Sequence, residues 1–198
     1  MTPEIVPRWE WRTFGESFGP ADMSLSALTP ERVQESDEIY LLSAADGDTV
    51  KVRDELMDVK HLEHVDQDGL EQWLPVMKAG FPLPAADVAG VLASLRVAAP
   101  PLERDAYTLD QLLDEVVQPT YDMRAVRVHK RRRRYTIGGC TSEWTDVSAD
   151  GSPTRTIAVE HEDPALVIAA VRELGLGSRP NTSYPQGLKT LLGFGVDG

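Results

Sequence analysis

The stretch from Val126 to Glu162, VRVHKRRRRYTIGGCTSEWTDVSADGSPTRTIAVEHE, decides the fold. Two turn signals divide it into three segments. Gly138-Gly139 is typical of a two-residue hairpin turn, and Asp150-Gly151 marks a second turn. We therefore expect an antiparallel meander of three strands, over 125–137, 141–147 and 155–162.

The two turns predict which residues face each other across the meander. The expected cross-strand pairs are Arg134 with Glu143, Arg132 with Thr145, Lys130 with Val147, and Glu143 with Glu160. The last pair brings two like charges together, which destabilises a sheet unless nearby cations compensate. The pairing thus predicts a site where positive and negative side chains converge.

Side chains alternate between the two faces of a strand, and here the alternation separates charged from apolar residues. Trp144, Ile157 and Val159 share one face, and a helix that begins at Pro164 is expected to cover it. The opposite face carries five charged residues: Lys130, Arg132, Arg134, Glu143 and Glu160. This face either lies open to solvent or lines an enclosed space.

The same alternation recurs in earlier segments, which favours the enclosed space. Charged residues share a face in three further groups: Arg8 with Glu10 and Arg12, Lys51 with Arg53, and Asp58 with Lys60. Strands with an apolar outside and a charged inside are expected in a closed barrel with a polar lumen. A solvated outer face remains the alternative.

The remaining segments complete an α+β protein whose helices flank a closed antiparallel barrel of eight strands, in a single domain over 1–198. Further strands are expected over 8–14, 38–42, 49–53, 56–62 and 70–78, the last of them broken at Pro75. A loop over 15–28 is expected to lead to a short helix opened by Thr29-Pro30-Glu31. Other helices are expected over 84–95, 108–117, 164–174 and 186–192.

Composition limits the partners. The net charge is −12, with 20 Lys and Arg against 32 Asp and Glu, so most of the surface repels nucleic acid and anionic membranes. No segment approaches the ~20 apolar residues of a membrane span. The single cysteine, Cys140, cannot form an internal disulfide and fits a reducing compartment. We expect a cytoplasmic protein that binds neither membranes nor nucleic acid and that could form a homodimer.

Several motifs, in their order along the chain, resemble the CYTH, or triphosphate tunnel metalloenzyme, superfamily. Its members are eight-stranded antiparallel tunnels that act on triphosphates and related substrates. The matching motifs are Arg8-Trp9-Glu10-Trp11-Arg12, which resembles the opening Glu-x-Glu-x-Lys, then Val50–Arg53, Met57–Lys60, Lys130–Tyr135, Glu143–Thr145, Glu160–Glu162 and Ser183-Tyr184. The resemblance spans about residues 8–192.

The resemblance implies that a chain of phosphates is bound in the tunnel together with Mg²⁺ or Mn²⁺. Cations would bind the phosphates, because Arg offers planar forks and Lys offers point charges: Arg8, Arg12, Lys51, Arg53, Lys60, Lys130, Arg132 and Arg134. Carboxylates would hold the metal: Glu10, Glu143, Glu160 and Glu162. Glu10, Glu143 and Glu160 would also be catalytic.

The chain departs from the family pattern in ways that leave several functions open. Arg8 stands where the family has its first Glu, Arg12 replaces a Lys, and Thr145 replaces an Asp. We expect a metal-dependent phosphohydrolase that acts on inorganic triphosphate, polyphosphate or an organic triphosphate. The alternatives are a non-catalytic protein that binds polyphosphate or a nucleotide, and a class IV-like adenylate cyclase.

Overall fold

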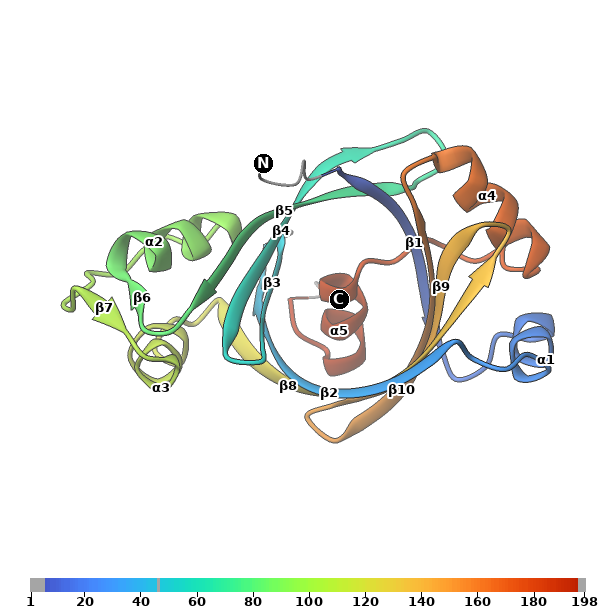
Figure 1. Cartoon of the computed structure of the whole chain (residues 1–198). Coiled ribbons are helices and arrows are strands. Elements are labelled where there is room, and N and C mark those ends of the chain that lie inside the picture. Colours follow the sequence, from blue (N-terminus) through green and yellow to red (C-terminus); the bar gives the residue numbers. More distant parts are fainter. Residues whose placement is uncertain (1–5, 46, 196–198) are drawn as a thin grey trace.

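The strands close into one barrel, as expected (Figure 1). The structure, a computed structural model, describes residues 6–45 and 47–195, so the ends of the expected domain lie outside it. The barrel order is β1-β10-β9-β8-β2-β3-β4-β5, with every neighbouring pair antiparallel. The strands are β1 (Arg8–Gly15), β2 (Arg32–Ser43), β3 (Thr49–Arg53), β4 (Leu56–Val65), β5 (Glu71–Gly80), β8 (Met123–Ile137), β9 (Cys140–Ala149) and β10 (Ser152–His161). The predicted closed, eight-stranded α+β barrel is confirmed.

Helices flank two sides of the barrel, and one helix lies within its outline (Figure 1). One flank carries α1 (Pro20–Ser26) and α4 (Pro164–Glu173). The other flank carries α2 (Ala85–Ser94), α3 (Leu109–Gln111) with its π-helical continuation η1 (Leu112–Val117), and the short strands β6 (Leu83–Pro84) and β7 (Ala106–Tyr107). The central helix is α5 (Tyr184–Leu192). Thr108 and Gln111 form a capping box at the start of α3, where the sequence predicts a helix to begin.

The first hairpin of the meander forms with the predicted register. Gly138 and Gly139 make the turn with φ angles of 55° and 83°, which glycine adopts without steric cost. All three predicted pairs between β8 and β9 are present, namely Arg134 with Glu143, Arg132 with Thr145 and Lys130 with Val147. The turn therefore sets the positions of the basic side chains in the barrel.

The predicted register of the second hairpin is wrong. Asp150 and Gly151 form a tight two-residue turn, so Ala149 pairs with Ser152, and Glu143 lies opposite Ala158. Glu160 lies opposite Thr141. The error is an even number of residues, so Glu143 and Glu160 keep the same face of the sheet without lying directly opposite each other.

The segment between β1 and β2 also differs from its prediction. The helix lies at Pro20–Ser26, inside the predicted loop, and the segment 29–31 forms no helix. β2 begins at Arg32 because its first half pairs with the basic run of β8, from Arg32 opposite Arg134 to Asp37 opposite His129. This pairing with a distant strand is not visible in local sequence patterns.

β5 runs through Pro75 to Gly80 and is longer than the predicted strand. A register shift between Val59 and Lys60 of β4 accommodates the proline, because Val59 pairs with Met77 and Lys60 pairs with Pro75. A bulge is a usual place for a proline in a sheet. Lys60, next to the shift, lines a cavity together with Arg8 and Glu10 of β1.

The apolar face of the meander is buried under α4, as expected. Val167, Ala170 and Val171 of α4 pack in one cluster with Ile157 and Val159 of β10. The charged face is enclosed as well, since Lys130 is only 1% exposed and Arg12 only 7%. The alternative of a solvated charged face is therefore wrong.

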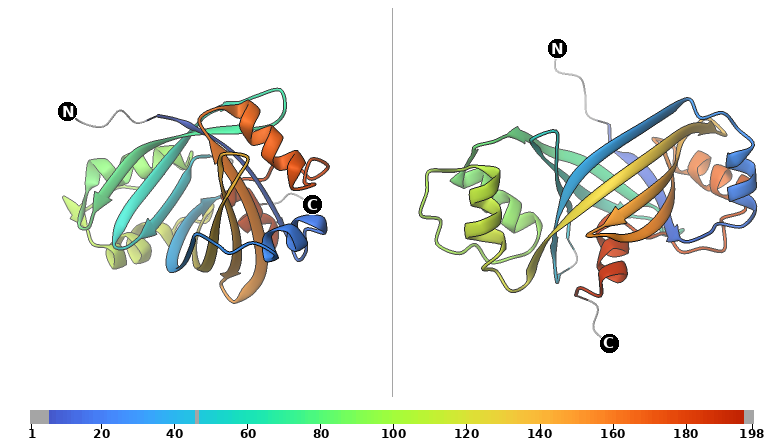
Figure 2. Two further views of the ribbon diagram at one scale, coloured as in Figure 1. Left: turned by 45° about the vertical axis from the view of Figure 1, so that its right-hand side comes forward. Right: turned by 90° about the horizontal axis from the view of Figure 1, so that it is seen from below.

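Helix α5 packs into the lumen and fills one end of the barrel (Figures 1 and 2). Tyr184 and Leu188 pack there against Val126, Val128 and other apolar side chains that point inward from the strands. Ser183 caps the helix by accepting a hydrogen bond from the Gln186 backbone. The lumen thus has an apolar end, occupied by α5, and a charged end.

The closeness of α5 to β1 generates a test. A Cβ atom added at Gly187 would overlap the Phe14 ring, whereas one at Gly90 in α2 would meet nothing within 4 Å. Gly187→Ala should destabilise the protein by roughly 1–3 kcal/mol through overpacking. Gly90→Ala should stabilise it by up to about 1 kcal/mol. Urea unfolding of both variants measures the difference, and equal effects would show that α5 does not press against β1.

Candidate functional site

Charged side chains from several strands converge on one cavity of about 220 Å³ inside the barrel, which we call the chamber. Ten residues predicted from the sequence line it: Glu10, Arg12, Lys51, Arg53, Lys60, Lys130, Arg132, Arg134, Glu143 and Glu160. Gln34, Tyr40 and Tyr184 complete the lining. Strand alternation brings these side chains together, since β1, β3 and β8 each contribute residues two positions apart.

Two predicted site residues lie elsewhere. Arg8 lines a smaller cavity of about 110 Å³, which shares Glu10, Lys60 and Glu160 with the chamber. Glu162 is exposed and follows the end of β10 at His161. The structure therefore brings ten of the twelve predicted site residues into the chamber, places Arg8 beside it and leaves Glu162 outside.

Glu38 of β2 is the anion around which the cations are arranged, and sequence reasoning missed it. Its side chain has no exposed surface. Its carboxylate accepts hydrogen bonds from Lys130 Nζ at 2.8 Å, from Lys51 Nζ at 3.2 Å and from the Arg132 guanidinium. Burial alone would raise the pKa of Glu38, but Lys130, Lys51 and Arg132 outweigh it and hold the pKa far below its ordinary value. Glu38 therefore stays ionised as their shared counterion.

Two tyrosines form the floor of the chamber next to this cluster. Lys130 Nζ donates to Tyr40 Oη at 2.6 Å and lies 3.7 Å from the ring centroid of Tyr184. The Arg12 guanidinium lies 4.4 Å from the same centroid, and the two tyrosine rings stack at 5.2 Å. Cation–π contacts of this kind stabilise buried positive charge. Tyr184 comes from α5, so the helix that fills the apolar end of the lumen also stabilises the cations at the charged end.

The buried lysines are crowded by other cations. Burial lowers the pKa of Lys130 well below its ordinary value, and the neighbouring Lys51 lowers it further, while Glu38 opposes both effects. The pKa of Lys51 is lowered by burial too, again against Glu38. A bound anion would relieve this crowding, because it favours the charged form of both lysines.

Three carboxylates lie in a row across adjacent strands at the side of the chamber. Glu10 of β1 is directly opposite Glu160 of β10 and also opposite Glu71 of β5. Burial and the charge of Glu10 raise the pKa of Glu71 to about 7, and the same two causes raise the pKa of Glu160. Burial would also raise the pKa of Glu10, but Arg12 and Lys60 hold it below its ordinary value. Negative charge is thus concentrated at this row.

Arg12 is fixed from several sides. Its Nε donates to Glu10 Oε1 at 2.9 Å, and its Nη1 donates to Thr156 Oγ1 at 2.8 Å. Its backbone N–H donates to Asn181 Oδ1 at 2.7 Å, and its carbonyl accepts from the Thr182 N–H at 2.7 Å. The segment before α5 therefore continues the hydrogen bonding of β1 where its pairing with β5 has ended at Glu10.

Three of the four carboxylates expected to bind a metal already have partners from the chain. The pairs are Glu10 with Arg12 at 2.9 Å, Glu143 with Arg134 at 2.9 Å, and Glu160 with Arg8 at 3.4 Å. Among the residues that the structure describes, no group of three or more His, Cys, Asp or Glu side chains is placed to hold a metal ion. As arranged, these residues do not fit a resident Mg²⁺ or Mn²⁺.

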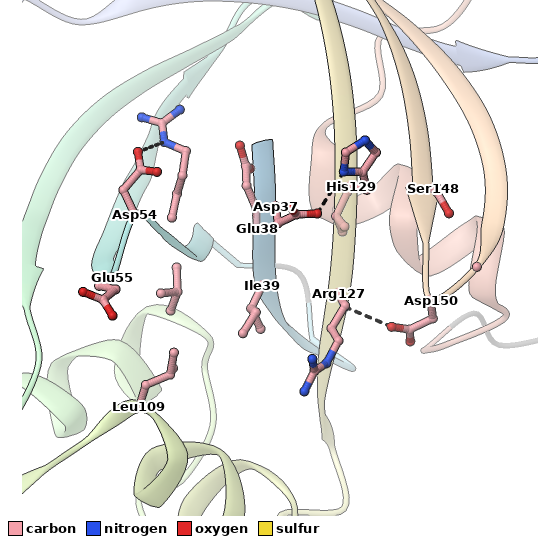
Figure 3. Close-up of a pocket in the computed structure, with 14 residues that line it drawn as sticks. Asp37, Glu38, Ile39, Asp54, Glu55, Leu109, Arg127, His129, Ser148 and Asp150 are labelled. Carbon is pink, nitrogen blue, oxygen red and sulfur yellow. Dashed lines mark hydrogen bonds and ion pairs between the residues drawn. The ribbon is translucent and has the colours of Figure 1, made fainter. Parts of the chain in front are cut away.

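A larger hollow of about 610 Å³ lies between the barrel wall and α3 (Figure 3). Two pairs of charged side chains lie in it: His129 Nδ1 lies 2.9 Å from Asp37 Oδ1, and Asp54 contacts Arg53 at 3.7 Å. Ile39 and Leu109 contribute apolar surface. Carboxylates outnumber cations in the hollow, whereas seven cations face three carboxylates in the chamber. The chamber is therefore the candidate site for an anionic ligand.

One feature of the sequence could have assigned Glu38 and Tyr40, which sequence reasoning missed, to the site. Both lie in the predicted strand 38–42, two positions apart, and Glu38 pairs across the sheet with Arg53, which was assigned to the lumen. A buried glutamate follows from that pairing only when the order of strands in the barrel is known. The local sequence, EIYLL, indicates a strand and nothing more.

Comparison with known proteins gives only remote likenesses. No protein-family model matches the chain, and no curated protein matches it. Among solved structures, the chain is similar to HpAC1 from Hippeastrum, a putative adenylyl cyclase described as having a dominant triphosphatase activity. The identity is 12% and the TM-score 0.48, and the match covers 92% of this chain and 95% of HpAC1. The PH1012 protein of Pyrococcus horikoshii OT3 is 15% identical with a TM-score of 0.49, covering 90% and 98%. A putative adenylate cyclase of Bacillus halodurans is 11% identical with a TM-score of 0.47, covering 90% and 96%. TM-scores this low carry no functional argument.

Within the described residues, no helix is both long enough and apolar enough to cross a membrane.

The Glu38 cluster generates a stability test. Glu38→Gln removes the shared counterion and leaves Lys51, Lys130 and Arg132 close together in a buried space. Removing one partner of a buried ion pair costs about 3–5 kcal/mol, so the free energy of unfolding should fall by that amount in urea denaturation.

Glu35→Gln is the matched control on the same strand. Glu35 is 61% exposed on the outer face and pairs with Arg131 at 3.5 Å, so its loss should cost at most about 1 kcal/mol. Equal losses in the two variants would contradict the central role of Glu38.

Proposed function

We propose that the chamber binds a linear chain of phosphates, such as inorganic triphosphate, polyphosphate or the phosphates of a nucleotide. One observation carries this proposal: seven cationic side chains line the chamber against three carboxylates, in a protein whose net charge is −12. An acidic protein that concentrates cations in one enclosed space is built to attract an anion of high charge density.

The kinds of cation support a phosphate ligand. Arg12, Arg53, Arg132 and Arg134 offer guanidinium groups that can bind two phosphate oxygens at once, and Lys51, Lys60 and Lys130 offer compact charges. The cations come from β1, β3, β4 and β8, so they surround the space instead of forming a flat patch. A ligand with several successive anionic groups would contact more of them than a single phosphate could.

A buried hydroxyl group supports the same ligand. Tyr184 Oη is buried in the chamber floor and has no hydrogen-bond partner among the described residues. A buried hydroxyl without a hydrogen-bond partner destabilises the folded protein, and a bound phosphate oxygen would supply the missing acceptor. Burial raises the pKa of Tyr184, so the hydroxyl keeps the proton that it would donate.

Hydrolysis of the bound chain is the second candidate function, favoured by the position of Glu160. Its carboxylate lines the chamber beside the cations, and its one hydrogen-bond partner among the described residues is Arg8, at 3.4 Å. A water molecule would attack a terminal phosphorus, its proton would pass to Glu160, and the bridging P–O bond would break with its electron pair on the leaving phosphate. The expectation of a metal-dependent phosphohydrolase stays a prediction.

The binding proposal is tested by two adjacent arginines that point to opposite faces of β8. Arg132→Gln removes a cation from the chamber and should weaken tripolyphosphate binding about 10- to 100-fold, the loss of one or two charge-assisted contacts. Arg131→Gln changes the same charge on the outer face, where Arg131 pairs with Glu35, and should leave the affinity unchanged. Isothermal titration calorimetry measures both. Equal weakening would indicate attraction by overall charge, and no binding by the wild-type protein would refute the proposal.

Another variant distinguishes hydrolysis of the phosphate chain from its binding. Glu160→Gln keeps the shape of the side chain and should abolish phosphate release from tripolyphosphate while binding persists, because only the proton acceptor is lost. Colorimetric phosphate detection measures the rate. Full release by this variant would exclude Glu160 as the proton acceptor.

A further inference from the structure

We propose that the chamber binds its phosphate ligand without a divalent metal ion, because side chains of this protein hold the positions of positive charge beside the carboxylates. The inference rests on the proposed phosphate-binding function and concerns which groups neutralise the carboxylates of the same chamber.

The first step concerns where a metal would have to bind. The resemblance placed it on Glu10, Glu143, Glu160 and Glu162, and the barrel brings the first three of these carboxylates to one cavity. Glu10 and Glu160 are directly opposite each other on β1 and β10. Two carboxylates in this relation need a positive charge between or beside them. The question is what supplies that charge.

The second step is that the chain supplies it. The small cavity beside the chamber is lined by Arg8 and Lys60 together with Glu10 and Glu160, two cations against two anions. Arg8 Nη1 lies 3.4 Å from Glu160 Oε1. The charge of Lys60 acts on both carboxylates. It lowers the pKa of Glu10 and of Glu160, whereas burial raises the pKa of each, and for Glu160 the raising causes outweigh it. The two charges that a divalent ion would bring are already present.

The third step is that the remaining carboxylates are engaged as well. Arg12 holds Glu10 at 2.9 Å with both side chains largely buried, and Arg134 holds Glu143 at 2.9 Å. Arginine keeps its charge throughout the accessible pH range. A divalent ion at these oxygens would have to displace guanidinium groups and remain next to them, which electrostatic repulsion opposes.

The sequence shows how this state arises from two positions. Arg8 stands where the resemblance expects a glutamate, which removes one carboxylate from β1 and adds one guanidinium. Thr145 stands where an aspartate is expected, and it is buried beside Thr156 and Arg132 in the sheet. Both departures reduce the negative charge available to a metal.

The wild-type protein gives the first test. Tripolyphosphate is titrated into the protein by calorimetry, once with EDTA and once with excess Mg²⁺. We expect binding in EDTA at least as tight as in Mg²⁺, since Mg²⁺ neutralises the ligand in solution and the chamber needs the free anion. Binding that appears only with Mg²⁺ would overturn the inference while leaving the phosphate site standing. No binding under either condition would refute the proposed function itself.

A substitution gives the second test. Arg8→Glu removes the guanidinium next to Glu160 and adds a carboxylate to β1, so it should create Mn²⁺ binding at least about tenfold tighter than in the wild-type protein. Electron paramagnetic resonance of free Mn²⁺ measures this directly, without any reaction. Arg172→Glu makes the same charge change at an exposed position of α4 and should leave Mn²⁺ binding unaltered.

The outcomes of the second test are distinct, provided that circular dichroism shows both variants folded. Tight Mn²⁺ binding by the wild-type protein would overturn the inference. Equal Mn²⁺ affinities of Arg8→Glu and Arg172→Glu would overturn the assignment of Arg8 as the charge that excludes the metal. If Arg8→Glu does not fold, the wild-type titrations still decide the main point.

Discussion

The buried carboxylate of Glu38 is the interaction on which the charged end of the barrel depends. Lys51, Lys130 and the Arg132 guanidinium all donate to it, from strands β3 and β8 on either side of β2. Three cations could not share a buried space without such an anion, because each would lose its hydration without gaining a partner. One carboxylate nevertheless leaves them short of negative charge. The chamber is thus held together by Glu38 and remains able to attract an external anion.

The two ends of the lumen contribute differently to the charged site. α5 fills one end with apolar side chains and places Tyr184 beneath Lys130 and Arg12, where the aromatic ring stabilises their charges. The charged end keeps a cavity of about 220 Å³, where hydrogen bonds hold Arg12, Lys51, Lys130 and Arg132 before any ligand arrives. Fixed cations lose little conformational freedom when they bind an anion, which favours tight and selective binding. The fold therefore prepares the site instead of leaving its assembly to the ligand.

Strand alternation explains why so much of the site could be predicted from the sequence. A period of two depends only on local geometry, so Lys130, Arg132 and Arg134 could be assigned to one face before any partner strand was known. The register error at the second hairpin left the faces intact because the shift was even. Glu38 escaped prediction because its importance comes from β3 and β8, which are neighbours of β2 only in the closed barrel. Helix α1 was misplaced because the loop that holds it is defined by packing against distant residues such as Leu176.

The central claim is that the inward-facing cations of an acidic protein bind a chain of phosphates inside the barrel. Nitrogen-15 NMR of the arginine Nε and lysine Nζ groups during a tripolyphosphate titration tests it most directly. The account predicts that the signals of Arg12, Lys130 and Arg132 shift and saturate together, while those of Arg127 and Arg131 on the outer face stay in place. Saturating shifts at the outer arginines, with the inward-facing groups unchanged, would contradict it.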